Sequence, residues 1–151
     1  MSFYADCYIL VASRSPTLAK RLCEIFAPGG VEESAVNYHI PQFCNTPHVV
    51  FTEASQLMEY LAEHPHEKQS IYWRTKNPSN ALHVNVFYTN DGAMILGVAC
   101  PHSTREEEIL DSLKNEFSTT CGYITYECPP PDSTCEFMAL VKSFDEQNAS
   151  S

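Results

Sequence analysis

The segment from residue 81 to residue 99 constrains the fold of this chain more than any other. Apolar residues take every second position in two runs on either side of a turn sequence: Leu82, Val84, Val86 and Tyr88, then Met94, Leu96 and Val98. Alternation with a period of two is typical of β-strands, and the Asp-Gly pair between the runs suits a tight hairpin turn. We therefore predict that Ala81–Tyr88 and Ala93–Ala99 pair antiparallel around Asn90–Gly92.

Three other segments carry apolar residues at helical spacing. The first begins after Ser15 and Pro16, which suit the N-cap and the first helical position, and Gly29-Gly30 ends it. The second begins near Thr52 or Ser55, either of which is a suitable N-cap. The third begins after Thr104, which forms a capping-box pattern with Glu107. The apolar positions that predict their buried sides are Leu18, Leu22, Ile25 and Phe26, then Leu57, Met58, Tyr60 and Leu61, then Ile109, Leu110, Leu113 and Phe117.

Shorter apolar runs predict the remaining strands. These are Cys7–Ala12, Ala35–Ile40, His48–Phe51, Ser70–Arg74, Tyr123–Glu127 and Glu136–Lys142. Helices separated by hairpins indicate an α+β fold, with a mainly antiparallel sheet and about three helices packed on it. The elements of the N-terminal half follow the β-α-β-β-α-β order of a ferredoxin-like unit. We expect one domain over residues 1–144, followed by a flexible acidic and polar tail over residues 145–151.

The charge of the chain narrows the classes of partner. The formal net charge is −10 and the sequence pI is about 4.9, whereas nucleic-acid binding depends on Lys and Arg side chains that neutralise phosphates. We therefore expect no nucleic-acid partner and no binding to an anionic membrane. The acidity is concentrated in residues 104–151, which hold ten acidic residues against three basic ones. A surface of this sign favours a basic protein partner.

The N-terminal region and the cysteines bear on the compartment. Tyr8–Ala12 is far shorter than the roughly 20 apolar residues of a membrane-spanning helix, and no basic segment precedes it as in a signal peptide. We therefore expect a cytoplasmic protein. The seven cysteines are odd in number and form no CxxC pair, so free thiols are expected in that compartment.

The sequence contains no recognisable catalytic pattern. A glycine-rich phosphate loop and a GxSxG nucleophile elbow are both absent, so we expect no cofactor and favour binding over catalysis. A Cys/His site is the alternative. His39 and Cys44 lie five residues apart across a loop, and four residues in two similar Pro-containing motifs are of the zinc-ligand type: His64, His66, Cys100 and His102. Ordinary loop polar residues and partly buried thiols would produce the same pattern without a metal.

Two groups of residues are candidates for contact with a partner. Glu107, Glu108 and Asp111 share one face of the third predicted helix, opposite its apolar side. This pattern fits either a solvated face or an acidic patch that faces a partner. The single Trp, Trp73, lies between Tyr72 and Arg74, and these three residue types are common in interface hot spots, although a Trp in a strand is also typical of a core.

Together these features predict a non-enzymatic binding domain. Its small size, acidity and expected compartment fit an inhibitor or immunity-type protein that neutralises a basic partner such as a toxin. Two alternatives stay open: a small enzyme or metal-binding protein that uses a Cys/His site, and a homodimeric structural or regulatory domain that pairs through an exposed sheet edge.

Overall fold

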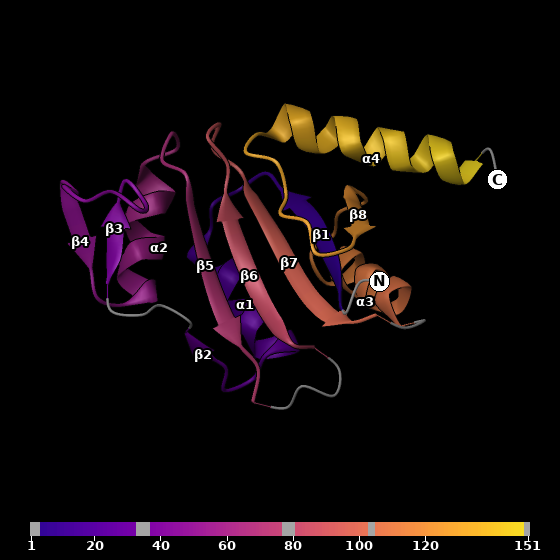
Figure 1. Cartoon of the computed structure of the whole chain (residues 1–151), viewed down its shortest axis with the longest axis horizontal. Coiled ribbons are helices and arrows are strands. Elements are labelled where there is room, and N and C mark those ends of the chain that lie inside the picture. Colours follow the sequence, from indigo (N-terminus) through magenta and orange to yellow (C-terminus); the bar gives the residue numbers. More distant parts are fainter. Residues whose placement is uncertain (1–3, 33–36, 77–80, 103–104, 150–151) are drawn as a thin grey trace.

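The predicted hairpin lies at the centre of the main sheet (Figure 1). The structure is a computed structural model that describes residues 4–32, 37–76, 81–102 and 105–149. Its strands are β1 (Tyr4–Val11), β2 (Val31–Glu32), β3 (Tyr38–Ile40), β4 (Val49–Phe51), β5 (Gln69–Arg74), β6 (His83–Tyr88), β7 (Met94–Pro101) and β8 (Gly122–Thr125). Its helices are α1 (Pro16–Phe26), α2 (Ala54–Glu63), α3 (Glu106–Glu116) and α4 (Thr134–Ala149).

The main sheet has six strands in the order β2-β5-β6-β7-β1-β8, and every adjacent pair is antiparallel. The predicted hairpin is confirmed, because β6 and β7 pair from His83 opposite Ala99 to Tyr88 opposite Met94. Gly92 has a φ of 94° in the turn, a left-handed conformation that glycine adopts without strain. The α+β class with a mainly antiparallel sheet is therefore confirmed.

The ferredoxin-like arrangement does not form. It would require the strands predicted at 35–40 and 48–51 to join the main sheet, but in the described part of these segments β3 and β4 pair with each other in a separate two-stranded sheet. Ile40 is fully buried, and Val49 and Phe51 pack against the core cluster that contains the apolar residues of α2. These short strands therefore bury their side chains beside α2 rather than in the middle of the main sheet.

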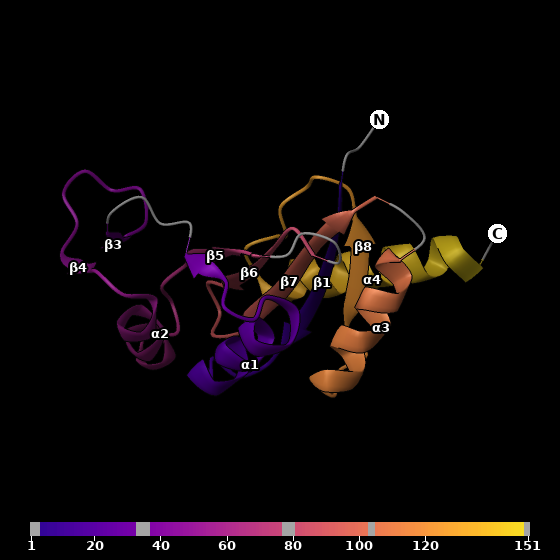
Figure 2. The same cartoon turned by 90° about the horizontal axis from the view of Figure 1, so that it is seen from below.

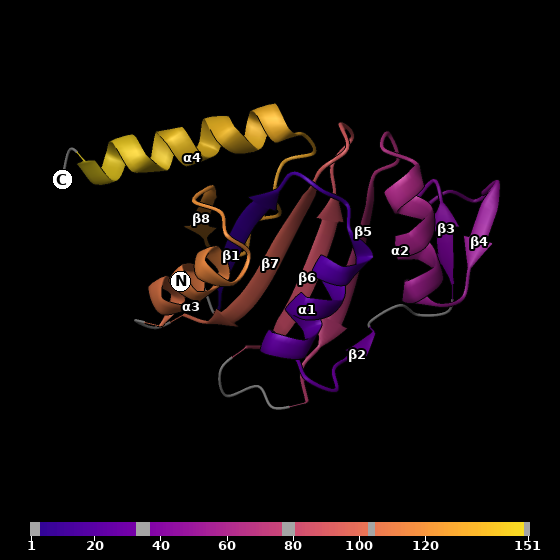
Figure 3. The ribbon, with the colours of Figure 1, turned by 180° about the vertical axis from the view of Figure 1, so that it is seen from behind.

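The main sheet has an apolar layer on each face. Helices α1, α2 and α3 lie on one face, where α1 crosses β6 and β7 and α3 packs on β1 and β8 (Figures 2 and 3). The core on that face includes Ile9, Leu22, Leu57, Leu96 and Leu113. Helix α4 covers part of the other face, where a smaller cluster contains Tyr8, Leu10, Ala93, Ile95, Tyr123 and Phe137.

The predicted final strand at Glu136–Lys142 is wrong, because these residues belong to α4. Phe137, Val141 and Phe144 follow the helical i, i+4, i+7 spacing and pack together on the second face of the sheet. Phe137 is fully buried, and the rings of Tyr123 and Phe144 stack with centroids 5.2 Å apart. The helix continues to Ala149, through most of the segment that was expected to be a tail.

The first residue of α1 agrees with the prediction, whereas the N-cap of α2 differs from it. Ser15 and Pro16 begin α1 as expected, although the Ser15 side chain makes no capping hydrogen bond. The N-cap of α2 is Glu53 rather than Thr52 or Ser55, and Oε1 of Glu32 accepts a hydrogen bond from the Ala54 backbone at 3.0 Å. The Glu32 carboxylate of β2 therefore accepts the hydrogen bond that the side-chain hydroxyl of Thr52 or Ser55 was expected to accept. Thr104 of the predicted capping box lies outside the described residues, and the N-cap of α3 is Arg105, whose side chain makes no capping hydrogen bond.

Candidate functional site

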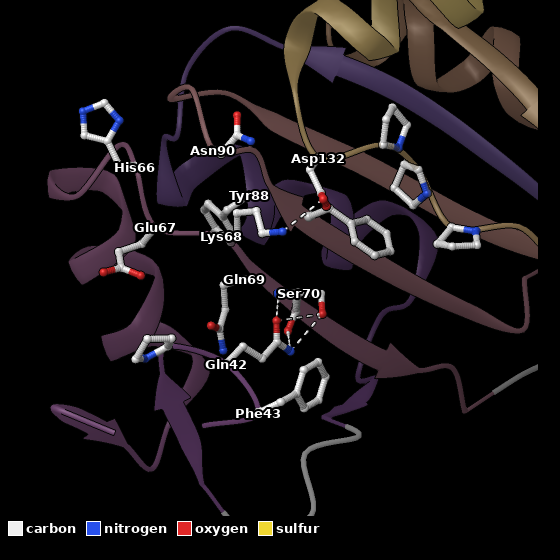
Figure 4. Close-up of a pocket in the computed structure, with 15 residues that line it drawn as sticks. Gln42, Phe43, His66, Glu67, Lys68, Gln69, Ser70, Tyr88, Asn90 and Asp132 are labelled. Atoms are coloured by element: carbon white, nitrogen blue, oxygen red, sulfur yellow. Dashed lines mark hydrogen bonds and ion pairs between the residues drawn. The ribbon is translucent and has the colours of Figure 1, made fainter. Parts of the chain in front are cut away.

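A pocket of about 670 Å³ lies beside the first residues of β5, and we call it the edge pocket (Figure 4). Four segments that are distant in sequence form its walls: the loop after β3, the turn before β5, the end of β6 and the proline-rich loop before α4. The residues that line it are Pro41, Gln42, Phe43, His66, Glu67, Lys68, Gln69, Ser70, Phe87, Tyr88, Asn90, Pro129, Pro130, Pro131 and Asp132.

Gln42 connects the loop after β3 to the outer edge of β5. Its Oε1 accepts a hydrogen bond from the Ser70 backbone N–H at 2.9 Å, and its Nε2 donates to the Ser70 carbonyl at 3.3 Å and to the Ser70 hydroxyl at 2.9 Å (Figure 4). The neighbouring Phe43 is 90% exposed and has a φ of 64°, which is uncommon for a residue with a side chain. The Gln42 carboxamide thus occupies the position that a neighbouring strand would take at Ser70.

An ion pair crosses the pocket. Lys68 Nζ lies 3.0 Å from Asp132 Oδ2, and both side chains are at least half exposed, so the pair adds little to stability. His66 and Ser70 both line the pocket (Figure 4).

Arg14 fixes the turn that forms one wall of the pocket. Its guanidinium is buried and donates to the carbonyls of Leu61 at 2.9 Å, His64 at 2.8 Å, Glu67 at 2.9 Å and also Thr89. In the part of the chain that is described, no carboxylate pairs with it. Four carbonyls accept hydrogen bonds from this buried cation, whose Nε has no partner among the described residues, and they connect the end of α2 to the hairpin turn.

Two side chains of β1 hold the proline-rich wall. The Tyr8 hydroxyl donates to the Cys128 carbonyl at 2.8 Å, and Asp6 Oδ2 accepts a hydrogen bond from the Cys128 N–H at 3.2 Å. Asp6 is 4% exposed, and burial raises its pKa to about 6 even though backbone N–H donors act in the opposite direction. The loop that carries the proline-rich wall is therefore bonded to a buried carboxyl, Asp6, whose pKa is raised to about 6.

The three acidic residues predicted to share one face of α3 are on the surface. Glu107, Glu108 and Asp111 are exposed, and among the described residues none of them forms an ion pair or a side-chain hydrogen bond. Two other acids of the helix differ: Glu106 is buried and pairs with His102 at 2.8 Å, and Glu116 pairs with Arg21 at 2.8 Å. We call Glu107, Glu108 and Asp111 the acidic face.

A groove of about 450 Å³ lies between the end of α1 and α3, directly beside the acidic face. We call it the α1–α3 groove; it is lined by Ile25, Phe26, Pro28, Ala81, Arg105, Glu108, Ile109 and Ser112. Ile25 is 38% exposed, whereas its helical spacing with Leu18 and Leu22 predicted a buried position. Adjacent residues of a helix point about 100° apart, and Phe26 packs against the core cluster while Ile25 lies at the margin of the buried side.

The predicted aromatic contact residues lie elsewhere. Trp73 is only 7% exposed and belongs to the core beneath α1, α2 and α3. Tyr72 is 36% exposed and lies on the opposite face of the sheet, beside Phe87. Arg74 is exposed at the end of β5. Because α3 packs on β1 and β8, the acidic face and β5 are on different parts of the sheet. The structure does not bring these two groups together into one surface.

The candidate metal ligands are also separated. His64 and His66 lie beside the hairpin turn, near the Met94 end of β7. Cys100 and His102 lie at the opposite end of β7, and six residues at about 3.3 Å each separate the two ends by roughly 20 Å. Among the described residues, no three His, Cys, Asp or Glu side chains form a group that could hold a metal ion. His39 Nδ1 contacts the Cys44 carbonyl at 3.1 Å rather than its thiol, and all seven cysteines are free.

Comparison with known proteins adds no functional assignment. No protein-family model matches this chain, and neither a curated protein nor a solved structure matches it. Among the helices as described, none has both the length and the apolar composition needed to cross a lipid bilayer.

Proposed function

We propose that this protein is a non-enzymatic protein-binding domain that engages a basic partner protein through the acidic face of α3. An inhibitor or immunity-type protein that neutralises a basic toxin is the specific form that we favour. One observation carries the proposal: the carboxylates of Glu107, Glu108 and Asp111 are exposed together and unpaired among the described residues, while Glu106 and Glu116 on the same helix are paired.

Unpaired carboxylates are available to an incoming cation without the loss of an internal ion pair. The three carboxylates of the acidic face lie within two helical turns, so their electrostatic potentials add. The net charge of −10 strengthens the attraction of a cationic partner at longer range. Such fields mainly raise the rate of association, and salt screens them beyond a Debye length of about 10 Å at 0.1 M. The mechanism is therefore charge-steered encounter, followed by burial of apolar contacts.

The test is kinetic and begins with affinity capture of a partner from the native host. A triple variant, Glu107→Gln, Glu108→Gln and Asp111→Asn, removes the charge of the acidic face. We expect it to lower the association rate about tenfold at low salt and to flatten the salt dependence, while the dissociation rate changes little.

The matched control removes three charges from other exposed positions, with Glu59→Gln, Glu63→Gln and Glu146→Gln. If the acidic face acts locally, this control lowers the association rate far less than the triple variant does. Equal effects from the two variants would reduce the proposal to non-specific net charge. An unchanged rate and salt slope in the triple variant would remove it.

A further inference from the structure

We infer that the α1–α3 groove receives an apolar side chain of the basic partner, so that the segment bound is amphipathic, with an aliphatic or aromatic residue flanked by Lys or Arg. This inference rests on the proposed function and specifies the chemistry of the partner. It replaces the aromatic anchor expected at Trp73 with a groove that adjoins the acidic face.

The groove and the acidic face are neighbouring sectors of one helix. Arg105, Glu108, Ile109 and Ser112 have the i, i+3, i+4, i+7 spacing of a single helix side, and all four line the groove. Glu107 and Asp111 lie one turn apart on the adjacent side. Glu108 belongs to both sectors, so one bound segment can contact the carboxylates and the groove together.

The groove has apolar walls that the fold leaves partly open. Ile25 projects from α1 at 38% exposure, and Phe26 and Ile109 are partly buried against the core. A volume of about 450 Å³ falls within the ~300–1,000 Å³ range of pockets that hold small ligands. It is therefore large enough to receive at least one large apolar side chain.

The charges around the groove identify the occupant. Glu107, Glu108 and Asp111 favour a cationic segment, whereas Arg105 is the one basic side chain among the groove residues that are described. A second copy of this chain is disfavoured, because a two-fold contact would place the same unpaired carboxylates against each other. A basic segment of a different protein meets no such repulsion.

Two synthetic peptides provide the test. One is lysine-rich with two leucines placed one helical turn apart, and the other has glutamine in place of both leucines. Their binding is measured by fluorescence anisotropy at low salt. We expect the leucine peptide to bind about tenfold more tightly, because burial of one apolar side chain is worth at least that factor.

Three variants locate the effect. Ile25→Ser shortens the wall and Ser112→Phe fills the groove, and each should abolish the preference for leucine. Val50→Ser, at a 47% exposed valine of β4, is the control and should keep it. The triple variant of the acidic face should weaken both peptides to a similar degree while the preference for leucine remains.

The outcomes separate the two proposals. A wild-type protein that binds both peptides equally, or an Ile25→Ser variant that keeps the tenfold preference, overturns the groove and leaves the acidic face standing. Failure to bind either peptide, or binding of both peptides that the triple variant leaves unchanged, overturns the proposed function together with this inference.

Discussion

The side-chain carboxamide of Gln42 bonds both backbone polar groups of Ser70, at 2.9 Å to its N–H and at 3.3 Å to its carbonyl. Among the described residues, β2 pairs with β5 at Trp73 and Arg74, and at Ser70 a side chain occupies the strand edge. Unpaired strand edges are sites of association between chains, and proteins commonly block them. Gln42 therefore bears directly on whether the chain forms a homodimer through its sheet edge.

Replacing Gln42 with alanine should make the protein self-associate. The substitution leaves the N–H and carbonyl of Ser70 open to pairing with a second molecule, while Phe43 stays exposed beside them. We expect multi-angle light scattering to show a concentration-dependent dimer that the wild type does not form. Gln56→Ala, at an exposed glutamine of α2, is the control. A Gln42→Ala protein that behaves like this control would mean that other features protect the edge.

Arg14 should be among the most sensitive positions for stability. Arg14→Met removes a buried cation and leaves four carbonyls without their donor, and we expect a loss of about 3 kcal/mol or more in urea unfolding. Arg21→Met, which breaks the exposed pair with Glu116, should cost about 1 kcal/mol or less. Similar losses in the two variants would contradict the role assigned to Arg14.

Asp6 should make the protein less stable as the pH rises toward neutrality. Its pKa is raised to about 6 in the folded state from 3.8, so the folded state binds its proton more tightly than the unfolded state does. The resulting stabilisation is fully present below pH 3.8 and is lost as the pH rises through about 6. Asp6→Asn keeps an acceptor for the Cys128 N–H and removes this charge. We expect it to stabilise the protein at pH 7 by up to about 3 kcal/mol.

Asp91 provides a control of opposite sign. Burial raises its pKa, but hydrogen bonds from Thr89 and Thr134 outweigh that effect and leave the pKa below its ordinary value. Its stabilisation is therefore present at neutral pH and lost as the pH falls, so Asp91→Asn should destabilise the protein at pH 7. Urea unfolding from about pH 2 to pH 7 covers both slopes, because the Asp91 slope lies below pH 3.8 and the Asp6 slope lies above it. A variant Asp6→Asn with the wild-type slope would show that Asp6 does not control this dependence.

Local sequence was sufficient wherever the decisive contacts are local. The β6–β7 hairpin needs only alternation and a turn, and the exposure of Glu107, Glu108 and Asp111 follows from the periodicity of α3. The segment at Glu136–Lys142 was misassigned because its apolar residues fit either a strand or a helix. The helix is favoured by tertiary contacts: Tyr123 of β8 packs against both Phe137 and Phe144.

No short stretch of the sequence predicted the edge pocket, because its walls come from four segments that are distant in sequence. Gln42 is an ordinary loop residue by sequence, and its role depends on the approach of β5, which begins many residues later. The same limit applies to Trp73, whose flanking residues suggested a contact site. The packing of the helices over the sheet decides that its indole is buried. Contacts between distant segments are what a reading of one sequence cannot supply.

The position of α4 has a consequence for how the molecule opens. Its apolar residues belong to a cluster separate from the core under α1, α2 and α3, with the sheet between them. Met138 and Leu140 remain exposed, at 55% and 38%, so only part of its apolar surface is buried. Backbone amides of α4 should therefore exchange with solvent deuterium through a local detachment, while those of β7 wait for global unfolding. In mass spectrometry with increasing urea, α4 would lose protection first and would briefly uncover Leu10, Ile95 and Tyr123, making the detached form the species most prone to aggregate.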